Sequence, residues 1–458
     1  MTEPTTIPAP TQHPDQPAAQ SIDQLVAHLF RREFGRIVSH LTRILGARHL
    51  DLAEDVVQHA MLQALNLWPF QGIPNHPKSW LTQVAYHRAL DILKRDRRLD
   101  FCEDEGELEL KAQLKPRPFH PPGEALHFTN EVADEQLSLI FVCCHPSLPR
   151  PASVALTLRV VCGFGIAEIA RAYLSTEIAI TQRLVRAKRT IRDQNIRFEV
   201  PGPTQLPDRL EAVLDVLYLL FTEGYAATTG DCLIKNDLCA EAIRLTTSLA
   251  ENAVTAQPQV HALLALMLFQ AARLPARTDA AGDLLLLEEQ DRTLWDRSMI
   301  HKGLRHLGQA AHGDHLSTYH LQAELAAAHA TTECFALTDW EHILTLYDLL
   351  RQMQPTPVVL INRAIALAQV EGPAAALDAL ESIPYDDHGQ RYRLRHAAEG
   401  EFHRQLGNLP QARTFFQRAL SCAQTDPERR FLERKLKSLQ KNALRRDDEA
   451  KGDTSKGL

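Results

Sequence analysis

Residues 165–193 read GIAEIARAYLSTEIAITQRLVRAKRTIRD, two helical patterns separated by a short polar break. The first pattern predicts a short helix over 167–174, and Ser175 and Thr176 then interrupt it and can cap a second helix over 177–192. A short helix, a tight turn and a longer helix form the helix-turn-helix pattern, whose second helix enters the major groove of DNA. On that second helix the helical spacing predicts a buried stripe of Ile180, Leu184, Ala187 and Ile191.

The remaining face of the second helix is polar and basic, with a net charge of +3 when Glu177 and Asp193 are included. Base edges in the major groove are read by Arg, Lys, Gln and Thr, and cations bind the phosphates. Arg183 and Arg186 are placed for bases, and Lys188 and Arg192 for phosphates. An ordinary amphipathic helix with a solvated basic face is the alternative, but the preceding helix and turn favour DNA. The predicted duplex contacts are Thr181, Gln182, Arg183, Arg186, Lys188, Arg189 and Arg192.

A second basic helix lies nearer the N-terminus, where residues 78–98 read KSWLTQVAYHRALDILKRDRR. Aromatic side chains alternate there with cations, which suits stacking on unpaired bases and binding of the strand's phosphates. For Trp80 a core position is at least as well supported, because Leu81, Val84 and Leu90 share its stripe. The predicted contacts with a melted strand are Lys78, Trp80, Tyr86, His87, Arg88, Lys94 and Arg95.

Outside these two helices, apolar residues recur at the i, i+3, i+4 spacing of a helix, and the alternating pattern of a strand is nearly absent. We therefore predict an all-α protein. Proline and glycine at 69–77 break the first helical block, and an acidic, proline-rich stretch separates it from the second. We predict a disordered leader (1–21), a first helical domain (22–98), a linker (99–134), the helix-turn-helix domain (135–198), a helical extension (207–436) and a disordered tail (437–458).

The extension contains a repeat. Residues 357–383 and 391–423 share a pattern in which Ala364 and Ala398, and likewise Gly372 and Gly407, are about one tetratricopeptide period apart. Each of the two glycines is predicted to end one helix and begin the turn to the next. The repeats are clearest over 319–423, and for residues 208–318 a generic helical bundle is an equal alternative.

Composition places the chain among soluble globular proteins, with 458 residues, 45% hydrophobic and 23% charged. The net charge of −7 is carried by the part beyond residue 206, while the first 206 residues are neutral because the linker is acidic and the two helical blocks are basic. No apolar run is long enough to span a membrane, and the N-terminus lacks a signal-peptide pattern. Eight cysteines without a CxxC pair suit a reducing compartment, so we predict a cytoplasmic location.

The sequence offers little for catalysis. Cys143, Cys144 and His145 are too close together in sequence to wrap a tetrahedral metal, so two buried thiols are the better interpretation. There is no HExxH, catalytic triad or nucleotide-binding glycine loop, and we predict no metal, no cofactor and no enzymatic activity. An acidic set lacks the order of a calcium loop and predicts instead a polar turn and helix start that orders the extension; it comprises Asp279, Asp283, Glu288, Glu289 and Asp291.

Together these stretches resemble the extracytoplasmic-function sigma factors. Residues 51–68, DLAEDVVQHAMLQALNLW, resemble the family's helix that docks on the polymerase clamp, which implies polymerase contacts by Asp51, Asp55 and Gln58. His59 stands there in place of the usual acid. Residues 79–95 resemble the helix that melts the promoter, with His87 where asparagine is common. Residues 148–174 keep the Leu-Pro start and the Glu-Ile-Ala core of the domain that reads the upstream promoter element.

The rear part resembles the extension of one subgroup of these factors, which carries tetratricopeptide-like repeats. The clearest matches are LYLLFTEGYAA (217–227) and ARTDAAGDLLLLEEQDRTLWDR (276–297). The resemblance implies a sigma factor with RNA polymerase core and promoter DNA as partners, a further protein partner for the repeats, and activity modulated by the extension. The alternatives are a helix-turn-helix regulator with a ligand- or protein-sensing repeat domain that acts without polymerase, and a tetratricopeptide-like scaffold.

Overall fold

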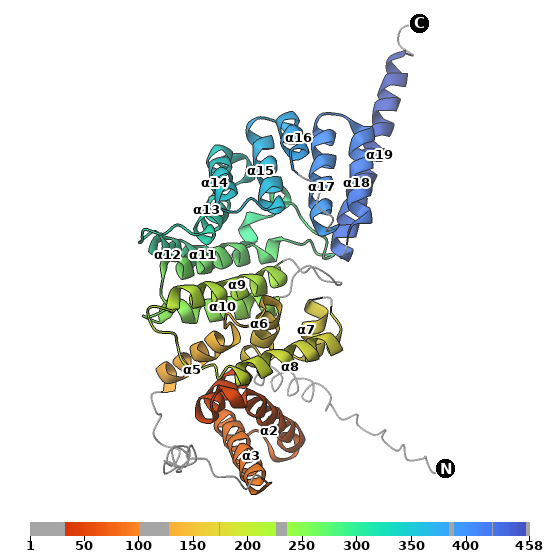
Figure 1. The fold of residues 1–458 in the computed structure, drawn as a ribbon. Coiled ribbons are helices and arrows are strands. Elements are labelled where there is room, and N and C mark those ends of the chain that lie inside the picture. Colours follow the sequence, from red (N-terminus) through yellow and green to blue (C-terminus); the bar gives the residue numbers. More distant parts are fainter. Residues whose placement is uncertain are drawn as a thin grey trace, which may run out of the picture. The chain divides into compact units, whose positions relative to one another are not determined.

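The computed structural model describes residues 33–99, 128–173, 175–225, 236–383, 389–423 and 425–454 (Figure 1). These ranges contain helices and no strand, which confirms the predicted all-α fold. The predicted leader and most of the predicted linker lie outside the described residues. The chain divides into two compact units, one comprising residues up to Ile169 with Ile178–Gly202, and the other comprising Ala170–Glu177 with the residues from Pro203 onward.

The first helical block consists of a helix over residues 33–45, then α2 (Leu50–Gln71) and α3 (Pro77–Leu99). Gly72 ends α2 with a φ of 80°, a left-handed conformation that favours glycine, and its N–H donates to the Trp68 carbonyl (2.9 Å). Pro77 begins α3, where a residue without an N–H leaves no helical hydrogen bond unmade. The predicted break is therefore confirmed between Gly72 and Pro77, whereas Pro69, which was also expected to break the chain, lies inside α2.

The second block contains α5 (Phe128–Cys143), α6 (Arg150–Leu156), the single π-helical turn η2 (Thr157–Val161), α7 (Ile166–Ala172) and α8 (Glu177–Asp193). On α8 the four buried residues are the four that the sequence predicted. The predicted order of short helix, turn and longer helix is confirmed by α7 and α8. α5 begins at Phe128, earlier than the predicted start of this block at Glu135.

The first block packs in one unit with α5, η2 and most of α8 of the second block, although the sequence predicted two domains joined by a tether. A Cβ on Gly35 would lie 1.9 Å from the Val161 carbonyl oxygen of η2, so only glycine allows the two backbones to approach this closely. The Arg159 guanidinium lies 5.7 Å from the centre of the Phe34 ring. These contacts join residues more than 120 positions apart, which helical periodicity cannot predict.

The extension is a succession of helices that pack mainly on their neighbours in sequence (Figure 1). Its helices are α9 (Leu206–Tyr225), α10 (Asn236–Glu251), α11 (Pro258–Ala272), α12 (Arg297–Ala310), α13 (Thr318–Ala330), α14 (Trp340–Met353), α15 (Pro357–Val370), α16 (Pro373–Glu381), α17 (Gly389–Gln405), α18 (Leu409–Ser421) and α19 (Asp426–Thr454).

The two predicted repeats form the helix pairs α15–α16 and α17–α18. Gly372 and Gly407 stand in their turns with φ values of 95° and 79°, as predicted. Ala364 and Ala398 are both buried in one apolar cluster, because small side chains let neighbouring helices approach. Each predicted unit thus contains two helices joined at its glycine, and the repeat with its tetratricopeptide interpretation stays a prediction.

The segment between α11 and α12, residues 273–296, caps other helices of the extension. The Arg277 guanidinium donates to the carbonyl of Tyr225, the last residue of α9. Arg292 donates to the carbonyls of His329 (2.9 Å) and Thr332 (2.5 Å), at the end of α13. Helix C-termini leave carbonyls without helical partners and attract cations, so the positions of these two arginines are explained by capping.

The acidic set predicted to form a polar turn and helix start is in this segment. The Asp283 carboxylate pairs with Arg430 of α19, and Asp279 pairs with Arg434 at 3.8 Å. Leu284 and Leu286 pack in the apolar cluster of α18 and α19. Asp279 and Asp283 thus join this segment to α19, a contact that the sequence did not predict. Glu289 and Asp291 accept backbone hydrogen bonds in the short helical turns that follow, in keeping with the predicted polar turn.

At the C-terminus, α19 runs to Thr454, whereas the sequence predicted a disordered tail from residue 437. The prediction gave weight to the high charge of this stretch. The same residues include many strong helix formers (Ala, Leu, Lys, Arg, Gln and Glu) and no proline after Pro427, which favours continuation of the helix.

Arg292→Ala is expected to lower the free energy of unfolding by about 2–4 kcal/mol, because two charge-assisted hydrogen bonds are lost and two carbonyls are left unpaired. Its guanidinium also stacks on Trp295 (4.7 Å). Urea denaturation followed by circular dichroism measures the change. Arg351→Ala on the surface of α14 is the matched control and should stay within about 0.5 kcal/mol of the parent. Equal stability of the two variants would show that the capping contacts contribute little.

Candidate nucleic-acid and protein interface

The outer face of α8 carries most of the residues predicted to contact duplex DNA. Those with exposed side chains are Thr181, Gln182, Arg186, Arg189 and Arg192, whereas Arg183 is half-buried. Asp193 pairs with both Arg189 (3.2 Å) and Arg192 (3.3 Å) and partly neutralises the C-terminal end of the helix. The N-terminal half, which enters a groove in helix-turn-helix proteins, therefore presents Gln182, Arg183 and Arg186.

Two apolar residues of the same helix are also exposed and were not predicted. Ile178 and Val185 are 72% and 60% exposed and lie seven positions apart, hence on one face. Both are apolar residues at positions that the helical period places outside the buried stripe. An apolar residue on the predicted polar face is the sequence signal that could have identified them. Exposed aliphatic groups beside polar ones suit contact with thymine methyl groups in a major groove.

Lys188 lies apart from the other α8 cations, because its side chain is only 12% exposed and points at α2. Its ammonium lies 2.5 Å from Glu54 and 2.9 Å from Asp51. Burial alone would lower the pKa of Lys188, but the two carboxylates outweigh it and the pKa is raised. Lys188 is thus held charged in an ion pair rather than presented to solvent.

Glu54 is the centre of this contact. It is buried on α2, accepts from Arg159 of η2 (2.5 Å) as well as from Lys188, and also accepts from Gln58 (2.8 Å). We call Asp51, Glu54, Arg159 and Lys188 the Glu54 cluster. A buried carboxylate is stable when each oxygen has a charged or hydrogen-bonding partner, and Glu54 meets that condition.

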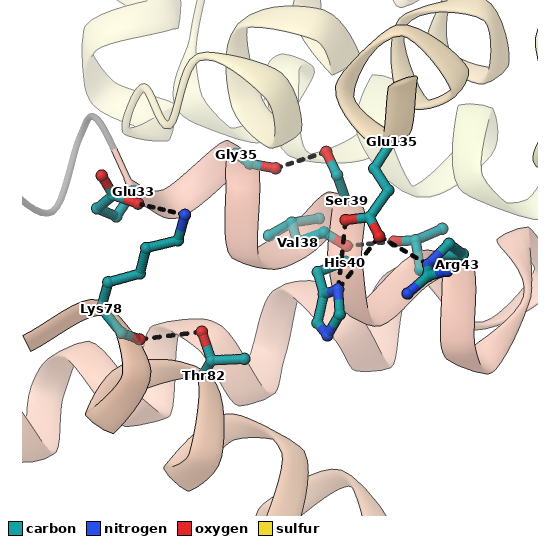
Figure 2. A network of polar contacts seen from close by, with 10 residues as sticks. Glu33, Gly35, Val38, Ser39, His40, Arg43, Lys78, Thr82 and Glu135 are labelled. Atoms are coloured by element: carbon teal, nitrogen blue, oxygen red, sulfur yellow. Dashed lines mark hydrogen bonds and ion pairs between the residues drawn. The ribbon is translucent and has the colours of Figure 1, made fainter. Parts of the chain in front are cut away.

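A second buried carboxylate joins the same two blocks, but here the carboxylate belongs to the second block and its partners belong to the first. Glu135 of α5 lies 2.7 Å from Arg43 and 3.3 Å from His40, both on the helix over residues 33–45 (Figure 2). We call these three residues the Glu135 cluster. Figure 2 also shows Lys78 of α3 directed at Glu33, at 3.8 Å.

The predicted melted-strand residues are arranged along α3. His87, Arg88, Lys94 and Arg95 are exposed, as is Lys78, which approaches Glu33. Tyr86 is half-buried with its ring 6.2 Å from that of His87. Trp80 is half-buried edge-to-face against buried Trp68 (5.6 Å), so it contributes to packing between α2 and α3, the alternative that the sequence left open.

One exposed stripe on α2 contains the predicted polymerase contacts. Asp51 and Asp55 are exposed and Gln58 is half-buried, and Leu62 (59% exposed) and Leu65 (45%) continue the same face. We call these five residues the α2 stripe. An acidic start followed by exposed leucines is typical of a surface that binds another protein, because a solvated helix face has no need of large apolar groups.

The paired cysteines at the end of α5 were predicted to be buried thiols. Cys143 and Cys144 are buried, as predicted, and burial raises the pKa of the Cys143 thiol well above its usual range. Within the ranges that the structure describes, no group of three or more His, Cys, Asp or Glu residues could hold a metal ion. In the same ranges, every helix is too short or too polar to cross a membrane.

Comparison with known proteins identifies the first block. Residues 29–99 match the Sigma-70 region 2 family, and residues 209–311 match a family of unknown function, DUF6596. ECF RNA polymerase sigma factor SigG of Mycobacterium tuberculosis is 27% identical over 225 residues, which cover 46% of this chain and 59% of SigG. No solved structure matches the chain. The region 2 match and the distant similarity to SigG support a sigma-factor-like role in transcription.

A much longer similarity exists to protein R00370 of Rhizobium meliloti (strain 1021), which is described as uncharacterized. The two are 39% identical over 394 residues, covering 86% of this chain and 91% of the relative. The chain therefore belongs to the same family as R. meliloti R00370, and its first block is a sigma-70 region 2 domain.

Proposed function

We propose that this chain is a sigma factor of the extracytoplasmic-function type, which binds core RNA polymerase in the cytoplasm, directs it to promoters and begins DNA opening. One observation carries the proposal. The domain that matches sigma-70 region 2 displays an acidic and apolar stripe on α2 and, separately, exposed cations with aromatic neighbours on α3. The first suits a protein partner and the second suits single-stranded DNA.

In this proposal each surface has a separate task. The α2 stripe binds the polymerase clamp, α3 holds the melted strand, and α8 reads upstream duplex through Gln182, Arg183 and Arg186. None of these contacts needs high affinity alone, because polymerase tethers them and raises their effective concentration.

In vitro transcription with purified core polymerase and full-length protein tests the proposal. We expect initiation at a subset of promoters that core enzyme alone does not use. If the protein binds promoter duplex but neither binds core polymerase nor supports initiation, it is a conventional helix-turn-helix regulator. Binding of neither would leave an interaction scaffold.

We further propose that the extension supports activity rather than only masking the DNA-binding face. Residues Ala170–Glu177, which include the turn before α8, belong to the same compact unit as the extension. The geometry of a helix-turn-helix depends on its turn, so removal of the extension from the unit that contains this turn is expected to disturb the motif.

Removal of residues 203–458 is therefore expected to reduce promoter output at least about tenfold. A tenfold change corresponds to roughly 1.4 kcal/mol of promoter-binding free energy, which is lost because α8 is positioned less well. Run-off transcription with residues 1–202 measures it, with circular dichroism as the control for folding. Constitutive output above that of the full-length protein would show instead that the extension masks α8. Unchanged output would show an independent module.

A further inference from the structure

Two guanidiniums of the extension lie against one indole ring. The centre of the Trp295 ring is 5.3 Å from the guanidinium carbon of Arg273 and 4.7 Å from that of Arg292. Trp295 and Arg292 are only 3% and 8% exposed, and Arg273 is half-buried. We call Arg273, Arg292, Trp295 and His329 the Arg292 cluster. Like charges that are brought together away from water repel each other, so this arrangement is unfavourable unless an anion neutralises it.

In the part of the chain that the structure describes, no carboxylate pairs with Arg273 or Arg292. Arg273 donates instead to the neutral amide of Gln290, whose Oε1 lies 3.4 Å from Nε and 3.3 Å from Nη2. Gln290 is buried and donates in turn to the Leu285 carbonyl (3.2 Å). Burial, and after it the charge of Arg273, lowers the pKa of Arg292. A neutral partner thus holds the Arg273 side chain in place without cancelling its charge.

The Arg292 cluster also contains unused hydrogen-bond donors. Capping of α13 uses Nη1 of Arg292, whereas its buried Nη2 has no hydrogen-bond partner among the described residues. The same is true, within the described ranges, of the buried Nε1 of Trp295 and Nδ1 of His329. Guanidinium and indole N–H groups can only donate. The cluster therefore lacks an acceptor, and its positive charge favours an acceptor that is an anion.

We infer that the Arg292 cluster binds an oxyanion, the phosphoryl or carboxylate group of a small molecule, between the guanidiniums of Arg273 and Arg292. Guanidinium forks bind both groups through paired N–H···O bonds, and Nε1 of Trp295 supplies a further donor. The site joins the residue that follows α11 to the end of α13, so an occupied site stabilises this part of the extension. The inference concerns the extension alone and does not depend on the sigma-factor role.

Isothermal titration calorimetry of the full-length protein with inorganic phosphate and with acetate tests the site, and the anion that binds identifies the class of group. Arg292 also caps α13, so the variant is made at Arg273. Arg273→Gln should weaken binding by roughly tenfold or more, because one charge-assisted contact is lost. Arg273→Lys keeps the charge without the fork and should bind with intermediate affinity. Arg351→Gln removes a cation from the surface of α14 and should bind as the parent does.

Thermal unfolding gives a second measurement of the same site. Phosphate stabilises many proteins without occupying a site, so each shift is measured against chloride at equal ionic strength and compared between variants. At about 100 times its Kd, the binding anion should raise the Tm of the parent and of Arg351→Gln by roughly 5 °C or more. The shift in Arg273→Gln should be clearly smaller.

Two outcomes would overturn the inference. Absence of binding heat with both anions would show that water satisfies the unused donors. Equal affinities and equal Tm shifts in Arg273→Gln and the parent would place any bound anion elsewhere on the chain. Circular dichroism checks that Arg273→Gln is folded. If it is not, the comparison of Arg273→Lys with Arg351→Gln decides by the same two measurements.

Discussion

Replacing Asp55 with arginine should abolish assembly with core RNA polymerase while the protein stays folded. Asp55 is exposed in the acidic half of the α2 stripe, and a partner complementary to this surface presents a cation opposite it. An arginine at this position would therefore repel the partner's cation. The expected loss is about 2–4 kcal/mol, or roughly 30- to 1,000-fold in affinity. Co-purification and fluorescence titration with core polymerase measure it.

Two companion variants make this result specific. Leu62→Asp lies farther along the same stripe, away from the Glu54 cluster, and should weaken binding without disturbing that cluster. Glu251→Arg makes the same charge change at the exposed last residue of α10, where a cation is favoured by the helix dipole, and should bind normally. Normal assembly of Asp55→Arg and Leu62→Asp would show that α2 is not the docking helix.

Simultaneous replacement of Arg183 and Arg186 by alanine is expected to remove promoter recognition. An arginine that contacts a base contributes about 1–3 kcal/mol of discrimination, so the pair should cost about 2–6 kcal/mol. Binding of holoenzyme to a set of upstream-element variants measures both affinity and sequence preference. Arg192→Ala, near a neutralising Asp193, should weaken all sequences equally. Retained preference in the double variant would mean that another face of α8 reads the DNA.

Helical periodicity predicted what depends on neighbours in sequence. The α8 stripe of Ile180, Leu184, Ala187 and Ile191 is buried because apolar side chains at this spacing share one face. Gly72, Gly372 and Gly407 marked turns because each adopts a positive φ. The all-α fold, the order of the elements and the exposed cations of α3 follow from the same local rules.

Contacts between distant residues could not be predicted in this way. Nothing near Lys188 in sequence indicates that it binds Glu54, 134 residues earlier, because a cation on a basic helix face has the same pattern whether it is solvated or paired. The close approach of Gly35 to Val161 is likewise a property of two surfaces. Among the predicted site residues, Lys188 and Trp80 are the ones whose surroundings depend most on such tertiary contacts.

The pairing of the 279–286 turn with α19 has a consequence for how the extension folds. Linear arrays of helix pairs gain stability from adjacent units, so they can nucleate anywhere and fray from their ends. Here Asp279 and Asp283 bind Arg434 and Arg430, about 150 positions later, and Leu284 and Leu286 pack in the cluster of α18 and α19. Such non-local contacts raise the entropy that must be lost before they form, which slows folding. The last helix is thereby tied to the first half of the array, and the extension should melt in one cooperative step instead of unzipping from its C-terminal end.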